Sequence, residues 1–156
     1  MKKIVVMSDN HGDDTMMQYI KEKEPNADYY IHCGDSEASL PMLLNGYICV
    51  KGNTDWSLDL PDEAKLEISG WSILVTHGQH FNFMNRQYSM NDLLTQKHCQ
   101  ILFCGHTHIP MFEKDGDYYY INPGSTNLPR GGSPRSYAVV TIDNANVQCQ
   151  FKEIKS

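Results

Sequence analysis

Two histidines separated by one residue follow a short apolar stretch in the second half of the chain. Residues 101–104 predict a buried strand that ends before Gly105, and His106 and His108 come directly after it. In an extended backbone, side chains two residues apart point the same way, so both imidazoles are expected to face one point beyond the strand. Paired imidazole nitrogens are ligands suited to a divalent transition metal. The spacing predicts part of a metal site, whose other ligands must come from elsewhere in the chain.

Four other apolar stretches also end in polar side chains with metal-binding chemistry. Residues 4–7, 29–33, 47–50 and 71–76 are predicted strands, since they are short and rich in apolar, β-branched or aromatic residues. Ligands of open α/β sheets bind at the carboxyl ends of the strands, so the polar residues that follow are expected to meet at one edge. These residues are Asp9 and His11, Asp35, Asn53 and Asp55, and His77.

Each of these residues also has an ordinary structural explanation. Asp9 and Asp35 could cap the helices that follow them. Asn53 could belong to a plain Asx turn, and His77 could be a buried histidine whose hydrogen bonds are satisfied. Polar clusters at five strand ends are nevertheless improbable as a coincidence, because helix capping does not require histidines there. The joint pattern therefore favours a metal site.

The mixture of ligands indicates how many ions the site would hold. Four histidines, two aspartates and an asparagine are too many for one tetrahedral ion. They suit two ions with one carboxylate between them, and nitrogen and oxygen ligands favour manganese, iron, nickel or zinc over calcium or magnesium. Two metals about 3.5–4 Å apart can clamp the attacking and leaving oxygens of an in-line displacement and activate water. The ligands therefore predict hydrolysis of a phosphoester.

The elements that must position these residues indicate an α/β fold. In the first half, the strands alternate with a helix at about residues 14–23 and a short helix capped by Ser36. This alternation implies parallel strands joined by right-handed crossovers. The apolar positions of the short helix are Leu40, Leu43 and Leu44.

The second half of the chain is richer in strands. It predicts a hairpin of residues 64–68 and 71–76, a helix over 86–96, and strands over 101–104, 111–114, 118–122, 137–143 and 147–153. The apolar positions of that helix are Tyr88, Leu93 and Leu94, and the tyrosines at 118–120 are expected to alternate between the two faces of their strand. The two halves together suggest two sheets packed face to face with helices outside.

Length and composition are those of one globular domain spanning residues 1–156, with 40% hydrophobic and 21% charged residues. The formal net charge of −6 argues against binding to a nucleic-acid duplex, although bound cations would let such a protein act on a phosphate. The apolar run near the N-terminus is too short for a secretory signal, and no segment approaches the length of a membrane span. The five cysteines form no Cys-x-x-Cys pair and are expected to be buried free thiols of a cytoplasmic protein.

The motifs at the strand ends resemble those of the calcineurin-like metallophosphoesterase superfamily. The short chain and the segment Asn122-Pro123-Gly124-Ser125 make it similar to the small bacterial and archaeal phosphodiesterases of the YfcE type. The resemblance covers residues 4 to about 143 in the order of the family, and the five motifs together are highly specific. The motifs are Asp9-x-His11, Gly34-Asp35, Gly52-Asn53-x-Asp55, His77-Gly78 and Gly105-His106-Thr107-His108.

The resemblance implies a four-layer α/β/β/α sandwich of two mixed sheets flanked by helices. It also implies a hydrolase of small phosphodiesters that uses two divalent transition metal ions, with manganese the first choice. A water or hydroxide between the ions would attack phosphorus, and Asp55 would orient the ligands. The implied ligands are Asp9, His11 and His108 for one ion, Asn53, His77 and His106 for the other, and Asp35 as a bridge between them.

Two positions depart from the pattern of the family. Thr54 stands where many members have a histidine that helps to protonate the leaving group or to bind phosphate, and a threonine cannot be a general acid near neutral pH. Activity is therefore expected to favour substrates with good leaving groups. Gln79 replaces the second histidine of a common His-Gly-His motif, and the neighbouring His80 is assigned to the substrate side, with a plain surface position as the alternative. Asn10 could contact the phosphate or hold its loop through an Asx bond.

Two other functions stay open from the sequence. A protein-interaction scaffold of this fold, like the retromer subunit, would keep most of the pocket but act by binding partners. The intact set of predicted ligands favours catalysis, whereas Thr54 leaves the scaffold open. A phosphomonoesterase would differ only in the pocket walls, which the sequence does not show. Apolar residues late in the chain could cover a sheet edge or form a homo-oligomer interface, and the sequence does not separate these.

Overall fold

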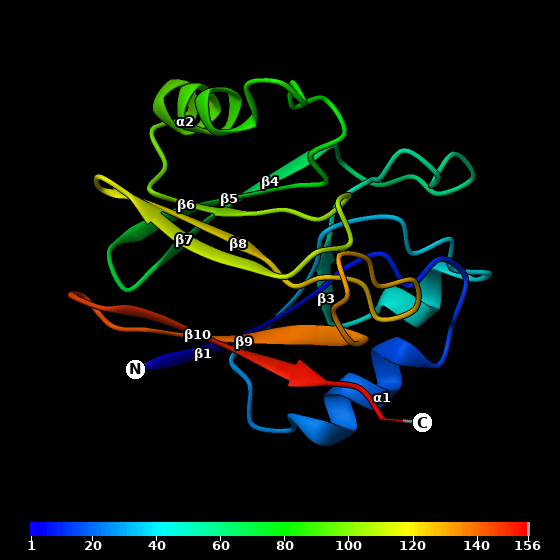
Figure 1. The fold of residues 1–156 in the computed structure, drawn as a ribbon. Coiled ribbons are helices and arrows are strands. Elements are labelled where there is room, and N and C mark those ends of the chain that lie inside the picture. Colours follow the sequence, from blue (N-terminus) through cyan, green and yellow to red (C-terminus); the bar gives the residue numbers. More distant parts are fainter. Residues whose placement is uncertain (156) are drawn as a thin grey trace.

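The computed structural model describes residues 1–155, and its elements form four layers. Two five-stranded sheets face each other, with α1 (Met16–Lys23) on the outer face of one and α2 (Arg86–Lys97) on the outer face of the other (Figure 1). The strand pattern and the family resemblance both predict this α/β/β/α arrangement, and the prediction is confirmed.

The first sheet has the strand order β10-β9-β1-β2-β3. β1, β2 and β3 run parallel, whereas β9 pairs antiparallel with both β1 and β10. Parallel neighbours need crossover connections, and α1 and the 3-10 helix η1 (Pro41–Leu44) lie in these connections. The carboxyl ends of β1, β2 and β3 therefore share one edge. The bounds are Lys2–Met7 for β1, Tyr29–His32 for β2, Tyr47–Cys49 for β3, Ser136–Ile142 for β9 and Val147–Glu153 for β10.

The second sheet has the strand order β4-β5-β6-β8-β7. β4 and β5 form the predicted hairpin, with Ser69 and Gly70 at positive φ in its turn. β5, β6 and β8 run parallel, so the residues that follow β5 and β6 lie at the same end of the sheet. The bounds are Glu63–Ile68 for β4, Trp71–Thr76 for β5, Ile101–Phe103 for β6, Met111–Asp115 for β7 and Tyr118–Asn122 for β8.

Three clusters of buried apolar side chains hold the layers together. The first lies between the sheets and takes side chains from both. The second joins the outer face of the first sheet to α1 through residues such as Ile20, and the third joins the other sheet to α2 through residues such as Leu94. Tyr119 packs against the first cluster and Tyr120 lies in the third, so the tyrosines of β8 alternate between faces as predicted.

The short helix predicted after Ser36 is present with Leu43 and Leu44 packed inward, but its predicted start is wrong. The next helix along the described chain is η1, which begins at Pro41, and Leu40 before it is 54% exposed rather than inward. The cause is local, because Asp35 and Glu37 have positive φ values that a right-handed helix does not contain. The chain can enter a helix only after this turn, where Pro41 is suited to the first helical position.

The apolar face predicted for the later helix also needs correction. Tyr88 is 72% exposed, and the buried residues of α2 are Met90 and Leu94. Met90 and Leu94 are one turn apart and share the face that packs on the sheet. Tyr88 lies about 200° around the helix from Met90, because each residue advances about 100°.

The cysteines agree with the sequence analysis in being unpaired. All five cysteines are free thiols, of which four are buried and Cys149 is half-buried. Within residues 1–155, no helix combines the length and the apolar character that crossing a membrane requires.

Candidate metal centre

The loops that follow β1, β2, β3, β5 and β6 gather at one end of the two facing sheets (Figure 1). All the ligands predicted from the sequence lie in these loops. Several of them have left-handed backbone, which costs free energy in a residue other than glycine and is concentrated at functional sites. These residues are Asp9 (φ 58), His11 (φ 42), Asp35 (φ 57), His106 (φ 72) and His108 (φ 64).

The predicted geometry of His106 and His108 is wrong, although both reach the site. Their φ values of 72 and 64 show left-handed rather than extended backbone. The two imidazoles therefore join different groups of ligands. His108 lies with Asp9 and His11, whereas His106 lies with Asp35 and His77.

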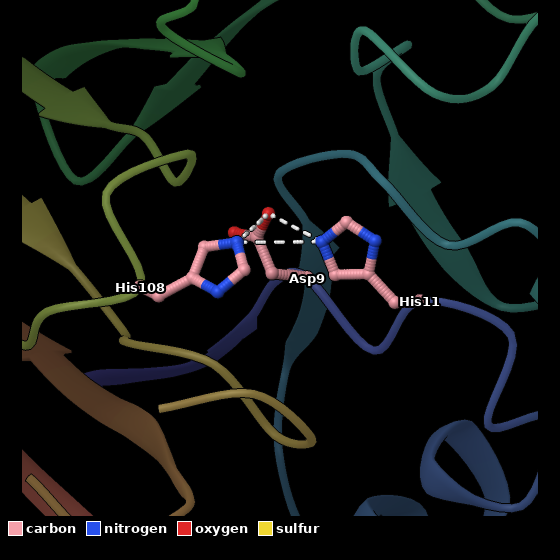
Figure 2. A group of neighbouring side chains, drawn as sticks. All are labelled: Asp9, His11 and His108. Carbon is pink, nitrogen blue, oxygen red and sulfur yellow. Dashed lines mark hydrogen bonds and ion pairs between the residues drawn. The ribbon is translucent and has the colours of Figure 1, made fainter. Parts of the chain in front are cut away.

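In the first group, two imidazoles face each other across the carboxylate of Asp9 (Figure 2). Asp9 Oδ1 lies 3.2 Å from His108 Nε2 and 3.4 Å from His11 Nε2. The two Nε2 atoms are 3.3 Å apart. Three potential ligand atoms thus surround a space the size of one metal ion.

The second group is centred on Asp35, which also faces the first group. Asp35 Oδ2 lies 3.1 Å from His77 Nε2 and 3.6 Å from His11 Nε2. His106 completes this group, in which one ligand atom of each residue lies within 4.8 Å of the others. Asp9 Oδ1 is in turn 3.8 Å from His77 Nε2, so both carboxylates lie between the two sets of imidazoles.

Backbone carbonyls fix the tautomer of two of these histidines. The Nδ1–H of His77 donates to the carbonyl of Cys33 at 2.8 Å. The Nδ1–H of His108 donates to the carbonyl of Leu128 at 2.7 Å. Because a carbonyl can only accept, Nδ1 carries the proton of each neutral ring, which leaves Nε2 as the nitrogen that can bind a metal. This is the ring orientation that metal-ligating histidines adopt.

Two buried atoms of the site have no hydrogen-bond partner among the described residues: Asp9 Oδ1 and His77 Nε2. Buried polar atoms are almost always paired, because burial without a partner costs free energy. Both atoms point into the space between the two ligand groups, where lone pairs of imidazole and carboxylate converge. A divalent cation would satisfy them, so the residues present fit a metal centre.

The charges of the metal-free site are strongly coupled. Burial raises the pKa of Asp9, but His108, His11 and His77 outweigh it and hold that pKa well below its usual range. Asp9 raises the pKa of His11 to about 9, against the effect of burial and with help from Glu37. A proton on His11 therefore occupies the place of a cation. Metal binding must displace this proton, so it is expected to tighten as pH rises.

The turn after β3 places the remaining predicted residues around Asp35. Asp55 is buried, and its Oδ2 accepts the backbone N–H of Asp35 at 2.8 Å and of Gly52 at 2.9 Å. The backbone N–H of Thr54 donates to Asp35 Oδ1 at 2.9 Å. Asn53, between Gly52 and Thr54 in the same turn, is exposed. Its role as a ligand stays a prediction, whereas the contacts of Asp55 are those of a residue that holds the Asp35 loop.

The two residues assigned to the substrate side lie away from the space between the ligands. Asn10 is fully buried, and its amide bonds the carbonyls of Asp13 and Ser36 at 3.1 Å each. These contacts favour the loop-holding alternative for Asn10. His80 is exposed and lines a cavity with Glu63 and Thr76 on the α2 side of β5, where none of the described lining residues is a predicted ligand. This position favours the plain surface alternative for His80.

The sequence analysis did not identify His32, which supports the site from the end of β2. Its side chain is fully buried, its Nε2–H donates to Asn10 Oδ1 at 2.7 Å, and its Nδ1 accepts the N–H of Gly34 at 3.0 Å. Burial lowers the pKa of His32 to about 4. An unfolded histidine titrates near about 6.5, so between these pH values only the unfolded chain gains a proton on this ring.

The stability of the metal-free protein should therefore fall as pH drops from about 6.5 to about 4. The full effect of His32 is about 3 kcal/mol, because each unit of pKa is worth about 1.4 kcal/mol. We expect His32→Gln to be less stable than the wild type at neutral pH and the gap to shrink toward pH 4. Urea unfolding of both proteins across this range measures the gap. A gap that does not change with pH would contradict the prediction.

Glu37 was also missed, and its side chain reaches the site. Its Oε2 lies 2.6 Å from Nδ1 of His11 and accepts the hydroxyl of Thr54 at 3.3 Å. A carboxylate can only accept from the imidazole, so in the neutral ring of His11 the proton is on Nδ1 and Nε2 is the nitrogen that can bind a metal. The sequence offered one weak signal for this role, which is the position of Glu37 two residues after Asp35 in the same loop.

Comparison with known proteins finds relatives over nearly the whole chain. The profile of the calcineurin-like phosphoesterase superfamily domain matches residues 1–145. A protein named "probable metallophosphoesterase YsnB" from Bacillus subtilis strain 168 is 35% identical over 150 residues, which cover 95% of this chain and 89% of that protein. The protein named "phosphodiesterase YfcE" from Escherichia coli strain K12 is 27% identical, with 94% of this chain and 91% of that protein aligned.

A solved structure has the same fold over nearly the whole of this chain. It is the crystal structure of a conserved protein of Streptococcus pneumoniae TIGR4, described as a predicted phosphoesterase, and is 31% identical. It superposes with a TM-score of 0.88 over 96% of this chain and 88% of that one. The family match spans both ligand groups and nearly all of the fold. The chain therefore belongs to the calcineurin-like phosphoesterase superfamily.

Proposed function

We propose that this protein is a phosphodiesterase that hydrolyses small phosphodiesters with two divalent cations, manganese being the first choice. One observation carries the proposal. Two groups of imidazole and carboxylate ligands converge on one buried space, in which Asp9 Oδ1 and His77 Nε2 have no hydrogen-bond partner. The name of the YfcE relative supports the choice of a diester as substrate.

Each ligand group is proposed to hold one cation. When bound, such cations polarise phosphoryl oxygens and lower the pKa of water. They also supply the positive charge that a chain of net charge −6 lacks, so that an anionic substrate can approach. The proposed ligands are Asp9, His11 and His108 for the first cation, Asn53, His77 and His106 for the second, and Asp35 between the two.

The residues around the ligands are proposed to position them rather than to transfer protons. Asp55 holds the backbone of Asp35 through the hydrogen bond to its N–H. The hydroxyl of Thr54 donates to Glu37, and a threonine does not release a proton near neutral pH. The leaving group must therefore depart without a proton from Thr54, which favours substrates whose leaving groups are stable anions.

The proposal is tested by turnover of bis(4-nitrophenyl) phosphate and 4-nitrophenyl phosphate by metal-stripped protein, with and without added Mn²⁺. We expect cleavage that depends on Mn²⁺, with a higher kcat/KM for the diester. Preference for the monoester would replace the proposal with a phosphomonoesterase. Absence of cleavage by protein that carries about two ions per chain would contradict it and favour a scaffold of the same fold.

We propose a cytoplasmic location for this activity. The four buried thiols and the half-buried Cys149 are unpaired, as is usual where the cell keeps thiols reduced. Fractionation of cells that express the native protein tests this, and recovery in an extracytoplasmic fraction would contradict it.

A further inference from the structure

The histidines of the two ligand groups differ in what lies behind them. His77 and His108 donate to backbone carbonyls, which carry no net charge. His11 instead faces the carboxylate of Glu37, whose Oε2 lies 2.6 Å from its Nδ1. The side chain of Glu37 is 39% exposed and that of His11 is 17% exposed, so this contact is partly shielded from water. One ligand of the first group therefore has a charged partner on the side away from the metal position.

The position of Glu37 is set by the backbone of its loop. The carboxylate of Asp55 accepts the N–H of Asp35 at 2.8 Å and the N–H of Glu37 at 2.9 Å. Between them the chain turns through left-handed backbone, with φ 57 at Asp35 and φ 48 at Glu37. The N–H of His11 donates to the carbonyl of Asp35 at 3.0 Å, which fixes the loop of His11 against the same segment. A strained turn held by this many contacts indicates a functional constraint on the side chain it presents.

A carboxylate behind a ligating histidine acts on the metal through the ring. It holds the imidazole in one orientation, keeps the lone pair on Nε2 and makes that nitrogen more basic toward a cation. Here Nε2 of His11 is 3.4 Å from Asp9 Oδ1 and 3.3 Å from His108 Nε2, so its orientation decides whether the first group can close on one ion. The loss of such a partner commonly costs about 10–100-fold in metal affinity or activity.

We propose that Glu37 is a positioning residue that orients His11 and raises the affinity of the Asp9/His11/His108 group for its cation. The Asp35/His77/His106 group makes no hydrogen bond to this carboxylate among the described residues, so loss of Glu37 is expected to weaken binding of the first cation more than that of the second. The hydroxyl of Thr54 donates to the same Oε2 at 3.3 Å and limits the freedom of the carboxylate. This inference rests on the two-cation centre of the proposed function.

The experiment is calorimetric titration of metal-free protein with Mn²⁺ alone. Wild type is expected to bind two ions, and Glu37→Gln, which keeps the size of the side chain but removes its charge, to bind one of them about 10–100-fold more weakly. Glu113→Gln is the matched control, because Glu113 is exposed on β7 and its change alters net charge equally. The rate of diester cleavage by Glu37→Gln should then need proportionally more Mn²⁺ and recover at saturation, which a purely structural defect would not do.

Four results would decide the matter. Selective weakening of one ion with recovery of the rate at high Mn²⁺ would support the role of Glu37. Unchanged binding of both ions would overturn it, and so would equal weakening of both, because that would indicate general damage to the site. Wild-type protein that binds no Mn²⁺ would overturn the proposed function, and this inference with it.

Discussion

Asp35→Asn is expected to lower kcat/KM for an aryl phosphodiester by at least about 10²–10³-fold, because Asp35 is proposed to share its charge between two cations and such a charge would stabilise the transition state by several kcal/mol. Asp35 Oδ2 lies 3.1 Å from His77 Nε2 and 3.6 Å from His11 Nε2, between the two ligand groups. Asparagine keeps the size of the side chain and an oxygen that can accept the N–H of Thr54, but it has no negative charge to share between two cations. The loss should therefore appear in metal binding and turnover rather than in folding.

Two measurements separate a loss of metal binding from a loss of folding stability. Metal-free wild type and Asp35→Asn should unfold at similar temperatures, whereas only the wild type should gain a large increase in Tm when Mn²⁺ is added. Asp62→Asn is the control, since Asp62 is an exposed loop aspartate beside β4 and the same chemical change there should leave turnover unchanged. Wild-type turnover by Asp35→Asn would show that the site assignment is wrong.

The sequence signal for the predicted ligands is local. A short apolar strand followed at once by a polar cluster can be read without knowing the fold, and five such transitions in parallel strands bring their side chains to one edge. The four layers follow for the same reason. The clusters of buried side chains beneath the two helices contain residues that the helix periodicity places on the inward faces, such as Ile20 and Leu94.

The backbone conformation of the loops could not be predicted from the sequence. His106 and His108 have left-handed backbone, which depends on tertiary hydrogen bonds such as that from the N–H of His106 to Asp9 Oδ2 at 3.0 Å. The acceptors behind the ligands were also unpredictable. A carbonyl such as that of Cys33 is present at every residue, and only the fold selects the one that faces His77. The sequence allows Asn10 either to contact the phosphate or to hold its loop. Only the fold shows that its side chain is buried.

The structure explains why the Gly52-Asn53-x-Asp55 motif begins with a glycine. Gly52 does not have left-handed backbone, so its conformational freedom is not what the site requires. A glycine is required because there is no room for a side chain. A Cβ at this position would overlap the backbone nitrogen and Oδ1 of Asp35 and lie 2.8 Å from its Cγ. The N–H groups of Gly52 and Asp35 both donate to Asp55 Oδ2, at 2.9 and 2.8 Å. The two segments therefore cannot separate without breaking a buried hydrogen bond to a carboxylate.

Gly52→Ala is accordingly expected to lower the free energy of unfolding of the metal-free protein by about 3 kcal/mol or more, at the upper end of overpacking costs. It should also remove binding of at least one Mn²⁺, since the overlap shifts the side chain of Asp35, which is proposed to be the ligand between the two cations. Gly116→Ala is the matched control, because Gly116 has φ 59 in the β7–β8 turn with open space around it and should cost only about 1 kcal/mol of backbone strain. Urea unfolding and Mn²⁺ titration of both variants make the comparison. If Gly52→Ala were no less stable than Gly116→Ala and still bound two ions, close approach of the two loops would not be what holds Asp35 between the ligand groups.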